Sequence, residues 1–320
     1  MPVASSTRSA VSVHWQASTL EVAGAAGPLA LRTCLPETGS VRAQVVVAAA
    51  IGVPQTYYTA FAQWLAQQGL AVTTFDYRGH GASRHGPLRR NKANLLDWAA
   101  DCKAIADKVR ARAPQLPLYW IGHSVGAQLP GMCDPPLPID GLLSIASGSG
   151  YWSDNAEPTR RKVLLWWHVI APVVTGVCGC LPGKRLGLVG DLPAGVVWQW
   201  RRWCMHPRYA IGVEGQRLYD AYAGALYPLH AMSIDDDEMM SWRSTASLMS
   251  WYRNAPQTVE RVRAQDVPQR RIGHFGFFRS EMQEYLWKRT TKVLDRWMNS
   301  AASGAGANPR GLHPQQRFAA

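Results

Sequence analysis

The residues Gly122-His123-Ser124-Val125-Gly126 form a G-x-S-x-G sequence directly after the apolar run Leu118–Ile121. A serine hydroxyl is a strong nucleophile only when a neighbouring base removes its proton. A serine on a very tight turn between a strand and a helix needs glycine two residues away on either side, because larger side chains would collide there. The pattern predicts a nucleophilic Ser124, and a structural serine in a turn is the alternative.

A histidine late in the chain is the expected base for Ser124, because triads on this kind of turn follow the order serine, acid, histidine. His274 meets that order just beyond the last predicted strand, and glycines on both sides let a loop bring its imidazole to the serine. A histidine that only packs in an aromatic loop is the alternative. His80 and His85, in a loop near the sheet rim, are weaker candidates, and His123 is expected to be a packing residue.

Three consecutive aspartates, Asp235 to Asp237, follow the apolar run Leu229–Ile234. A buried carboxylate there would hold the His274 tautomer and stabilise the imidazolium form. A charge run is usually a solvated turn, so two of the three aspartates are expected to face water. The other position for the acid, after Gly141–Ala146, offers no carboxylate before Asp154, which favours the later site.

The tetrahedral intermediate of acyl transfer needs two fixed N–H donors. The backbone of Val125, the residue after the nucleophile, is expected to supply one. The second is expected from the loop after Gln44–Ala50, where Ile51 is preferred and Gly52 is the alternative. Because the donors are backbone groups, they do not require a particular side chain.

The elements that must position these residues alternate between short β-rich runs and helical runs, which indicates a mostly parallel sheet. An antiparallel opening pair is expected at Thr19–Val22 and Leu29–Leu35. Further strands are expected at 44–50, 71–76, 118–121, 141–146, 229–234 and 259–264. Helices are expected at 57–68, 95–112 and 242–253, with a closing helix that starts at a Ser280/Gln283 capping box and ends near Met298.

The alternation stops between Tyr151 and Tyr227, where the chain becomes rich in tryptophan. We expect residues 151–227 to be a cap inserted between two parts of one α/β core, 1–150 and 228–298, with a disordered tail at 299–320. The cap tryptophans are expected to pack the cap's own core, and an acyl-chain pocket is the alternative. They are Trp166, Trp167, Trp198, Trp200 and Trp203.

The uncharged segment Val163–Pro182 has about the length needed to span a bilayer. His168, Pro172 and the glycine and proline breaks near its end argue against a spanning helix. We expect instead an apolar lid helix that touches substrate or a membrane surface.

Composition narrows the classes of function. The net charge is +12, but the arginines are scattered and no nucleic-acid-binding module is present, so nucleic acid is not an expected partner. The six cysteines show no CxxC spacing or metal-ligand pattern, so neither a metal nor a cofactor is expected. Residues 1–16 lack the apolar run of a signal peptide, which favours reduced thiols and a cytoplasmic location.

Four motifs together resemble the α/β-hydrolase superfamily: Tyr77-Arg78-Gly79-His80-Gly81, Gly122–Gly126, Asp235–Asp237 and Ile272-Gly273-His274-Phe275-Gly276. More narrowly, residues 44–298 resemble bacterial predicted hydrolases of the serine aminopeptidase-like and monoglyceride-lipase-like group. The resemblance implies an α/β-hydrolase fold, with a mostly parallel central sheet flanked by helices and an inserted helical cap.

The resemblance also implies a triad of Ser124, Asp237 and His274, because the last aspartate of the cluster takes the acid position in related sequences. Asp236 is the runner-up. The chain departs from the pattern at Ala50–Val53, where relatives carry His-Gly, but a backbone donor at Ile51 tolerates that change.

These residues predict a serine hydrolase that cleaves a small-molecule carboxylic ester or related acyl bond through an acyl-enzyme on Ser124. An acyltransferase on the same triad and a non-catalytic binding protein on this scaffold are the alternatives. A peptidase would need a cap carboxylate for a free amine, and Glu157 or Glu214 could serve. Peripheral membrane contact through the cap is a further expectation. The oligomeric state does not follow from the sequence.

Overall fold

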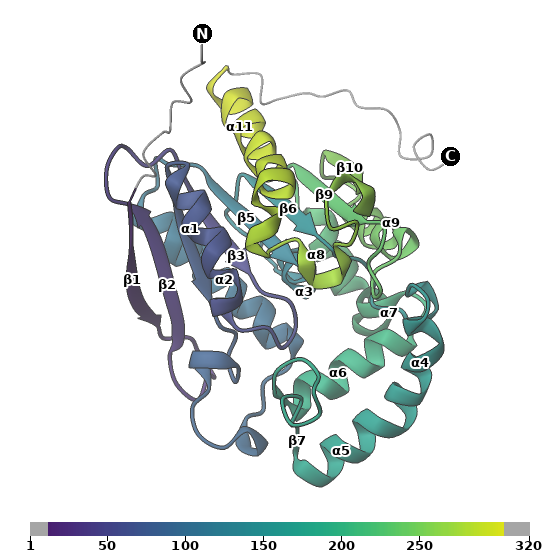
Figure 1. The fold of residues 1–320 in the computed structure, drawn as a ribbon. Coiled ribbons are helices and arrows are strands. Elements are labelled where there is room, and N and C mark those ends of the chain that lie inside the picture. The colour runs from purple at the N-terminus through teal and green to yellow at the C-terminus, as the bar shows by residue number, and fades with distance from the viewer. Residues whose placement is uncertain (1–11, 304–320) are drawn as a thin grey trace.

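The structure is a computed structural model that describes residues 12–303, and its centre is an eight-stranded sheet (Figure 1). The strand order is β1-β2-β4-β3-β5-β6-β9-β10. β1 pairs antiparallel with β2, and β2 with β4, whereas the remaining neighbours are parallel. The strands are β1 (Val13–Leu20), β2 (Leu29–Pro36), β3 (Ala43–Ala48), β4 (Leu70–Phe75), β5 (Leu118–His123), β6 (Gly141–Ile145), β9 (Leu229–Ile234) and β10 (Gln257–Val262). The predicted opening pair and the mostly parallel sheet are confirmed.

Burial explains which strands the sequence predicts well. Every residue of β3, β5, β6 and β9 is buried, so these strands read as mostly apolar runs. β1 is an edge strand with mostly exposed residues, and it begins at Val13. The predicted strand at Thr19–Val22 is therefore wrong in position, because an exposed edge strand leaves no apolar run to find.

Helices flank the sheet. α1 (Thr59–Gln67) and α11 (Lys288–Ala302) lie on one face of it (Figure 1), and Phe61 of α1 packs edge-on against Trp287 with ring centroids 5.3 Å apart. α2 (Leu95–Arg112) packs against β3 and against the turn that follows α3 (Val125–Gln128), and α9 (Trp242–Trp251) packs against β9. α2 matches its predicted range and begins at an Asn94–Asp97 capping box.

The closing helix differs from its prediction at both ends. A 3-10 turn, Ser280–Met282, and a π turn, Gln283–Trp287, precede α11, so the predicted Ser280/Gln283 capping box is wrong. α11 continues past Met298 to Ala302, so the predicted tail begins too early. The rest of that tail, 304–320, lies outside the described residues.

An inserted helical region separates β6 from β9, as the sequence predicts (Figure 1). It contains α4 (Thr159–Leu165), a π turn (Trp166–Ile170), α5 (Ala171–Cys178), a β7–β8 hairpin (Cys180–Leu181 with Leu192–Pro193), α6 (Ala194–Met205), α7 (Tyr209–Glu214) and α8 (Gln216–Gly224). The limits 151–227 of a separate cap stay a prediction.

Tryptophans fill the interior of this inserted region. Trp167 and Trp203 are buried, and Trp167 packs edge-on against Trp200 with ring centroids 4.9 Å apart. Trp198 is partly exposed. The core-packing prediction is thus confirmed for Trp167 and Trp203. Among residues 12–303, no helix combines the length and the apolar character that crossing a bilayer requires.

Candidate active site

Ser124 lies on a sharp turn between β5 and α3. Its φ is 54° and its ψ is −120°, a conformation that is costly for a residue other than glycine. A Cβ atom at Gly122 would lie 2.4 Å from the backbone nitrogen of Ala127, and one at Gly126 would lie 2.3 Å from the carbonyl oxygen of Ala48. Both glycines of the G-x-S-x-G sequence are therefore sterically required, as the pattern predicts.

His274 and Asp237 form a buried pair. His274 lies in the short helix α10 (Gly273–Gly276), and its Nδ1 is 2.8 Å from Oδ2 of Asp237. The other carboxylate oxygen accepts the backbone N–H groups of Met239 and Met240 at 2.7 and 2.8 Å. The two side chains are 2% and 0% exposed. Because a carboxylate accepts at Oδ2, the bond assigns a proton to Nδ1 and leaves Nε2 as the basic nitrogen.

The neighbouring carboxylates hold backbone rather than the imidazole. Asp236 accepts the N–H groups of Ile272 and Gly273 at 2.8 and 2.9 Å, which fixes the chain just before His274. Asp235 and Glu238 accept the N–H groups of Ala264 and His274, respectively, at 2.7 and 3.0 Å. Of the predicted candidates for the acid, Asp237 is the one bonded to the imidazole.

His123 has a role that the sequence analysis missed. Its Nε2 lies 2.9 Å from the carbonyl oxygen of His274, which only accepts, so Nε2 is the donor. Nδ1 therefore accepts from the hydroxyl of Tyr58 at 2.8 Å, and that hydroxyl accepts the N–H of Ala50 at 2.9 Å. Burial holds the pKa of His123 well below its ordinary value, and the nearby His274 lowers it further, so the ring is neutral.

This relay connects the loop after β3, the turn at Ser124 and the loop of His274. Tyr58→Phe would leave the Ala50 N–H and the His123 Nδ1 without their shared partner. We expect the free energy of unfolding to fall by about 1–3 kcal/mol. We also expect kcat to fall by about tenfold to a hundredfold with little change in KM, because displaced catalytic groups cost rate.

Steady-state ester hydrolysis and urea unfolding measure the two effects. Tyr285→Phe is the matched control, because Tyr285 is exposed. A Tyr58→Phe protein with the kcat of the unmodified chain would contradict the positioning role.

The two predicted oxyanion donors come from different parts of the chain: Val125 directly follows Ser124, and Ile51 lies just after β3. Val125 is the first residue of α3, so its N–H has no partner within the helix. Ile51 lies in the turn after β3, and within residues 12–303 neither N–H has a hydrogen-bond acceptor. The β7–β8 hairpin reaches the same turn, because the N–H of Gly190 donates to the carbonyl of Gly52 at 2.7 Å.

The loop of His274 packs against His123, the residue before Ser124. The ring of His123, next to Ser124 in the chain, lies 5.2 Å from the ring of His274 between centroids. In the described chain the Ser124 hydroxyl makes no hydrogen bond to His274. Such bonds often tighten only when substrate binds. The weaker candidates are engaged elsewhere: His85 bonds the carbonyl of Pro28, and His80 faces Asp76 at 3.8 Å.

Comparisons with known proteins identify the fold that positions these residues. The family described as serine aminopeptidase, S33, matches residues 39–174, which is less than half of the chain. A search of curated protein sequences found no match. A soluble variant of monoglyceride lipase from Saccharomyces cerevisiae, solved with a substrate analogue, superposes with a TM-score of 0.62 at 15% identity. That match covers 88% of this chain and 94% of the lipase.

Other solved structures share the fold. A putative lipase from Acinetobacter baumannii AYE has a TM-score of 0.55 at 12% identity, with 89% of this chain and 93% of that chain covered. An esterase from Pyrococcus furiosus has a TM-score of 0.53 at 13% identity, with 89% and 91% covered. The chain has the α/β-hydrolase fold. The predicted α/β-hydrolase fold is thereby confirmed.

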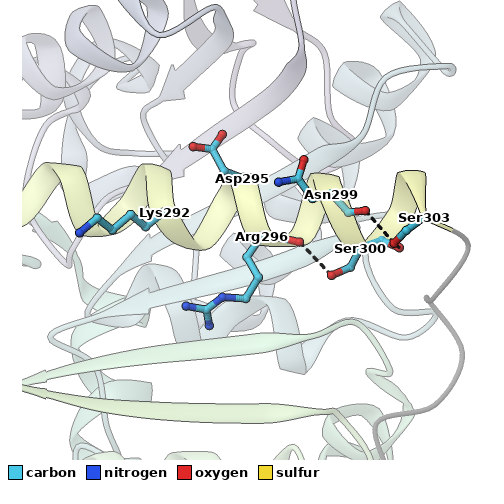
Figure 2. Close-up of a pocket in the computed structure, with 6 residues that line it drawn as sticks. All are labelled: Lys292, Asp295, Arg296, Asn299, Ser300 and Ser303. Atoms are coloured by element: carbon cyan, nitrogen blue, oxygen red, sulfur yellow. Dashed lines mark hydrogen bonds between the residues drawn. The ribbon is translucent and has the colours of Figure 1, made fainter.

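A large surface hollow of the molecule lies away from Ser124. It has a volume of about 630 Å³ and runs along α11, where polar and charged side chains line it (Figure 2). The lining residues are Lys292, Asp295, Arg296, Asn299, Ser300 and Ser303, and none of them is a predicted site residue. The hollow therefore has no part in the arrangement around Ser124.

Proposed function

We propose that this α/β hydrolase is a serine hydrolase that cleaves a carboxylic ester or a related acyl bond through an acyl-enzyme on Ser124. The observation that carries the proposal is the buried His274–Asp237 pair, held through His123 beside the strained turn of Ser124. Strained backbone and buried ionisable pairs lower the stability of a fold, and both features are concentrated at reactive sites.

The geometry supports a two-step reaction. The Ser124 oxygen attacks the acyl carbon while Nε2 of His274 takes the serine proton. Asp237 stabilises the imidazolium, and the N–H groups of Val125 and Ile51 donate to the oxyanion. The imidazolium then gives the proton to the leaving alcohol, and the acyl-serine remains. A water molecule, deprotonated by His274, attacks the acyl-serine. The bond to the Ser124 oxygen then breaks, the acid leaves, and the His274 imidazolium returns the proton to Ser124.

The contacts of the cap carboxylates favour an ester over a peptide with a free amine. Glu157 forms ion pairs with Arg160 and Arg161. Glu214 accepts hydrogen bonds from Gln199 at 3.0 Å and from Trp203 at 2.7 Å. Both predicted amine-binding candidates therefore already have partners. The esterase and lipase among the structural relatives agree with an ester substrate, but only at the level of the fold.

A fluorophosphonate probe and a series of p-nitrophenyl esters test the proposal. We expect the folded protein to be labelled at one serine and to hydrolyse the esters. If the acyl chain is buried, kcat/KM should rise by up to about fourfold per methylene, since each buried methylene contributes about 0.8 kcal/mol. A folded protein that is neither labelled nor active would support the binding-protein alternative. Faster product formation with an added alcohol would support acyl transfer.

A further inference from the structure

The helical stretch Thr159–Cys178 has an apolar outer face. Leu165, Val169, Val173 and Val177 recur every fourth residue and are exposed, Val177 at 82%, with Ile170 beside them. Residues four apart lie on one face of a helix. We call these five aliphatic residues the cap stripe. A contiguous aliphatic face in contact with water usually marks an interaction surface.

The inner face of the same stretch is already occupied. Trp167 is buried and packs against Trp200, and Ala171 and Thr175 are also buried. The stripe therefore faces outward because the opposite face forms the core of the inserted region. A rotation that hid the stripe would expose Trp167.

The charge around the stripe is mostly positive, although Glu157, which pairs with Arg160 and Arg161, and Asp191 flank it in the chain. Between Pro158 and Gly190 the chain contains no acidic residue and five basic ones, Arg160, Arg161, Lys162, Lys184 and Arg185. Arg161 precedes Leu165 by four residues and is 84% exposed at its side chain, so it extends the stripe at its N-terminal end. At the other end, Arg89 lies against Gly179. Basic side chains thus stand at both ends of an aliphatic face.

We propose that the cap stripe docks on an anionic lipid surface, with the helical stretch lying in the plane of the interface. Aliphatic side chains would enter the boundary of the acyl chains while the basic residues contact the headgroups. No helix among residues 12–303 is suited to span a bilayer, which fits a helix that lies on the surface. The inference goes beyond the proposed function, and it does not need a working Ser124.

Other occupants fit less well. A second copy of the chain would bring its own basic residues against these five, and like charges would oppose the contact. Protein interfaces are dominated energetically by tryptophan, tyrosine and arginine anchors, whereas the stripe is aliphatic throughout. An anionic lipid surface offers acyl chains to the aliphatic residues and negatively charged headgroups to the basic residues at the ends of the stripe.

Docking at the stripe would bring the lipid surface near the candidate active site. The β7–β8 hairpin follows α5 directly, and its Gly190 bonds Gly52 in the turn that supplies the Ile51 donor. A lipid ester drawn from the surface would then have a short path to Ser124. This consequence rests on the proposed function, whereas docking itself does not.

Vesicle co-sedimentation of the full chain tests the proposal. The vesicles contain phosphatidylcholine alone or with about 30% phosphatidylglycerol, and NaCl is set at about 50 or 500 mM. We expect binding to the anionic vesicles that weakens by about tenfold or more at the higher salt concentration. Two variants test the apolar and the basic parts of the surface separately. One is the triple variant Val169→Ser, Val173→Ser, Val177→Ser, and the other is the double variant Arg161→Glu, Lys162→Glu. Each should weaken binding by about tenfold or more.

A matched double variant, Lys292→Glu with Arg296→Glu, changes the net charge equally but on α11, away from the inserted region (Figure 1). It should bind within about twofold of the unmodified chain. Equal loss in this control and in the Arg161/Lys162 double, or full binding by the valine triple, would overturn the stripe as the docking surface. So would a chain that ignores the vesicles or that self-associates through the stripe. Fluorophosphonate labelling in the same samples reports the proposed function separately.

Discussion

Replacing Ser124 by alanine should abolish ester hydrolysis and fluorophosphonate labelling while leaving the protein folded. Loss of a catalytic serine costs about six powers of ten in kcat in a well-studied serine protease. The loss in stability should be small, because in the described chain the Ser124 hydroxyl makes no hydrogen bond and the change removes one oxygen atom. The turn itself depends on Gly122 and Gly126, which the substitution leaves in place.

The measurement is kcat with a soluble short-chain ester, together with the circular dichroism spectrum and the melting temperature. Ser149→Ala is the matched control, because Ser149 is also a buried serine but donates its hydroxyl to Asp154. It should be labelled and retain activity within about tenfold. Ordinary esterase activity in a folded Ser124→Ala protein would refute the proposed mechanism.

Local spacing is what made the nucleophile turn predictable. Gly122 and Gly126 are two residues from Ser124, and the collisions that they avoid involve backbone within the turn and on the neighbouring β3. The buried strands were predictable for a related reason, since burial on both faces leaves a mostly apolar run. β1 was placed wrongly because its residues are mostly exposed at the sheet edge.

Contacts between distant residues were not predictable from one sequence. Tyr58 and His123 are 65 positions apart, and no spacing rule connects them. The outward direction of the cap stripe could not be predicted from the sequence either. An uncharged run such as Val163–Pro182 shows that the segment is apolar, but not that Trp167 points inward while Val169 points outward.

The choice of Asp237 is the part of the site that sequence alone left open. Asp235, Asp236 and Asp237 are chemically identical, and only the direction of each side chain after β9 separates them. In the structure, Asp237 turns inward to Nδ1 of His274, whereas Asp236 bonds the backbone of Ile272 and Gly273. We therefore expect different effects on kcat and on stability when Asp237 and Asp236 are each replaced by asparagine.

Asp237→Asn should lower kcat by about 10⁴-fold, the size seen when a triad acid is replaced by its amide. The amide can present an N–H to Nδ1 and favour the tautomer with its proton on Nε2, which removes the base that Ser124 needs. Asp236→Asn keeps only one oxygen for two backbone N–H groups. It should lower the free energy of unfolding by about 1–2 kcal/mol and change kcat far less. Asp235→Asn should alter neither, because that side chain is exposed and the amide keeps one oxygen for the N–H of Ala264.

Measuring kcat and urea unfolding for all three variants separates a catalytic carboxylate from one that only holds the loop. The expected pattern is a rate defect without a large stability defect at Asp237, and the reverse at Asp236. A loss of about 10⁴-fold at Asp236 with normal activity at Asp237 would mean that the acid is one position earlier. Because the Asp237→Asn protein has lost the observed partner of His274, its normal activity would also require the imidazole to turn towards Asp236 during the reaction. The three-variant comparison thus tests both the identity of the acid and the pairing seen in the structure.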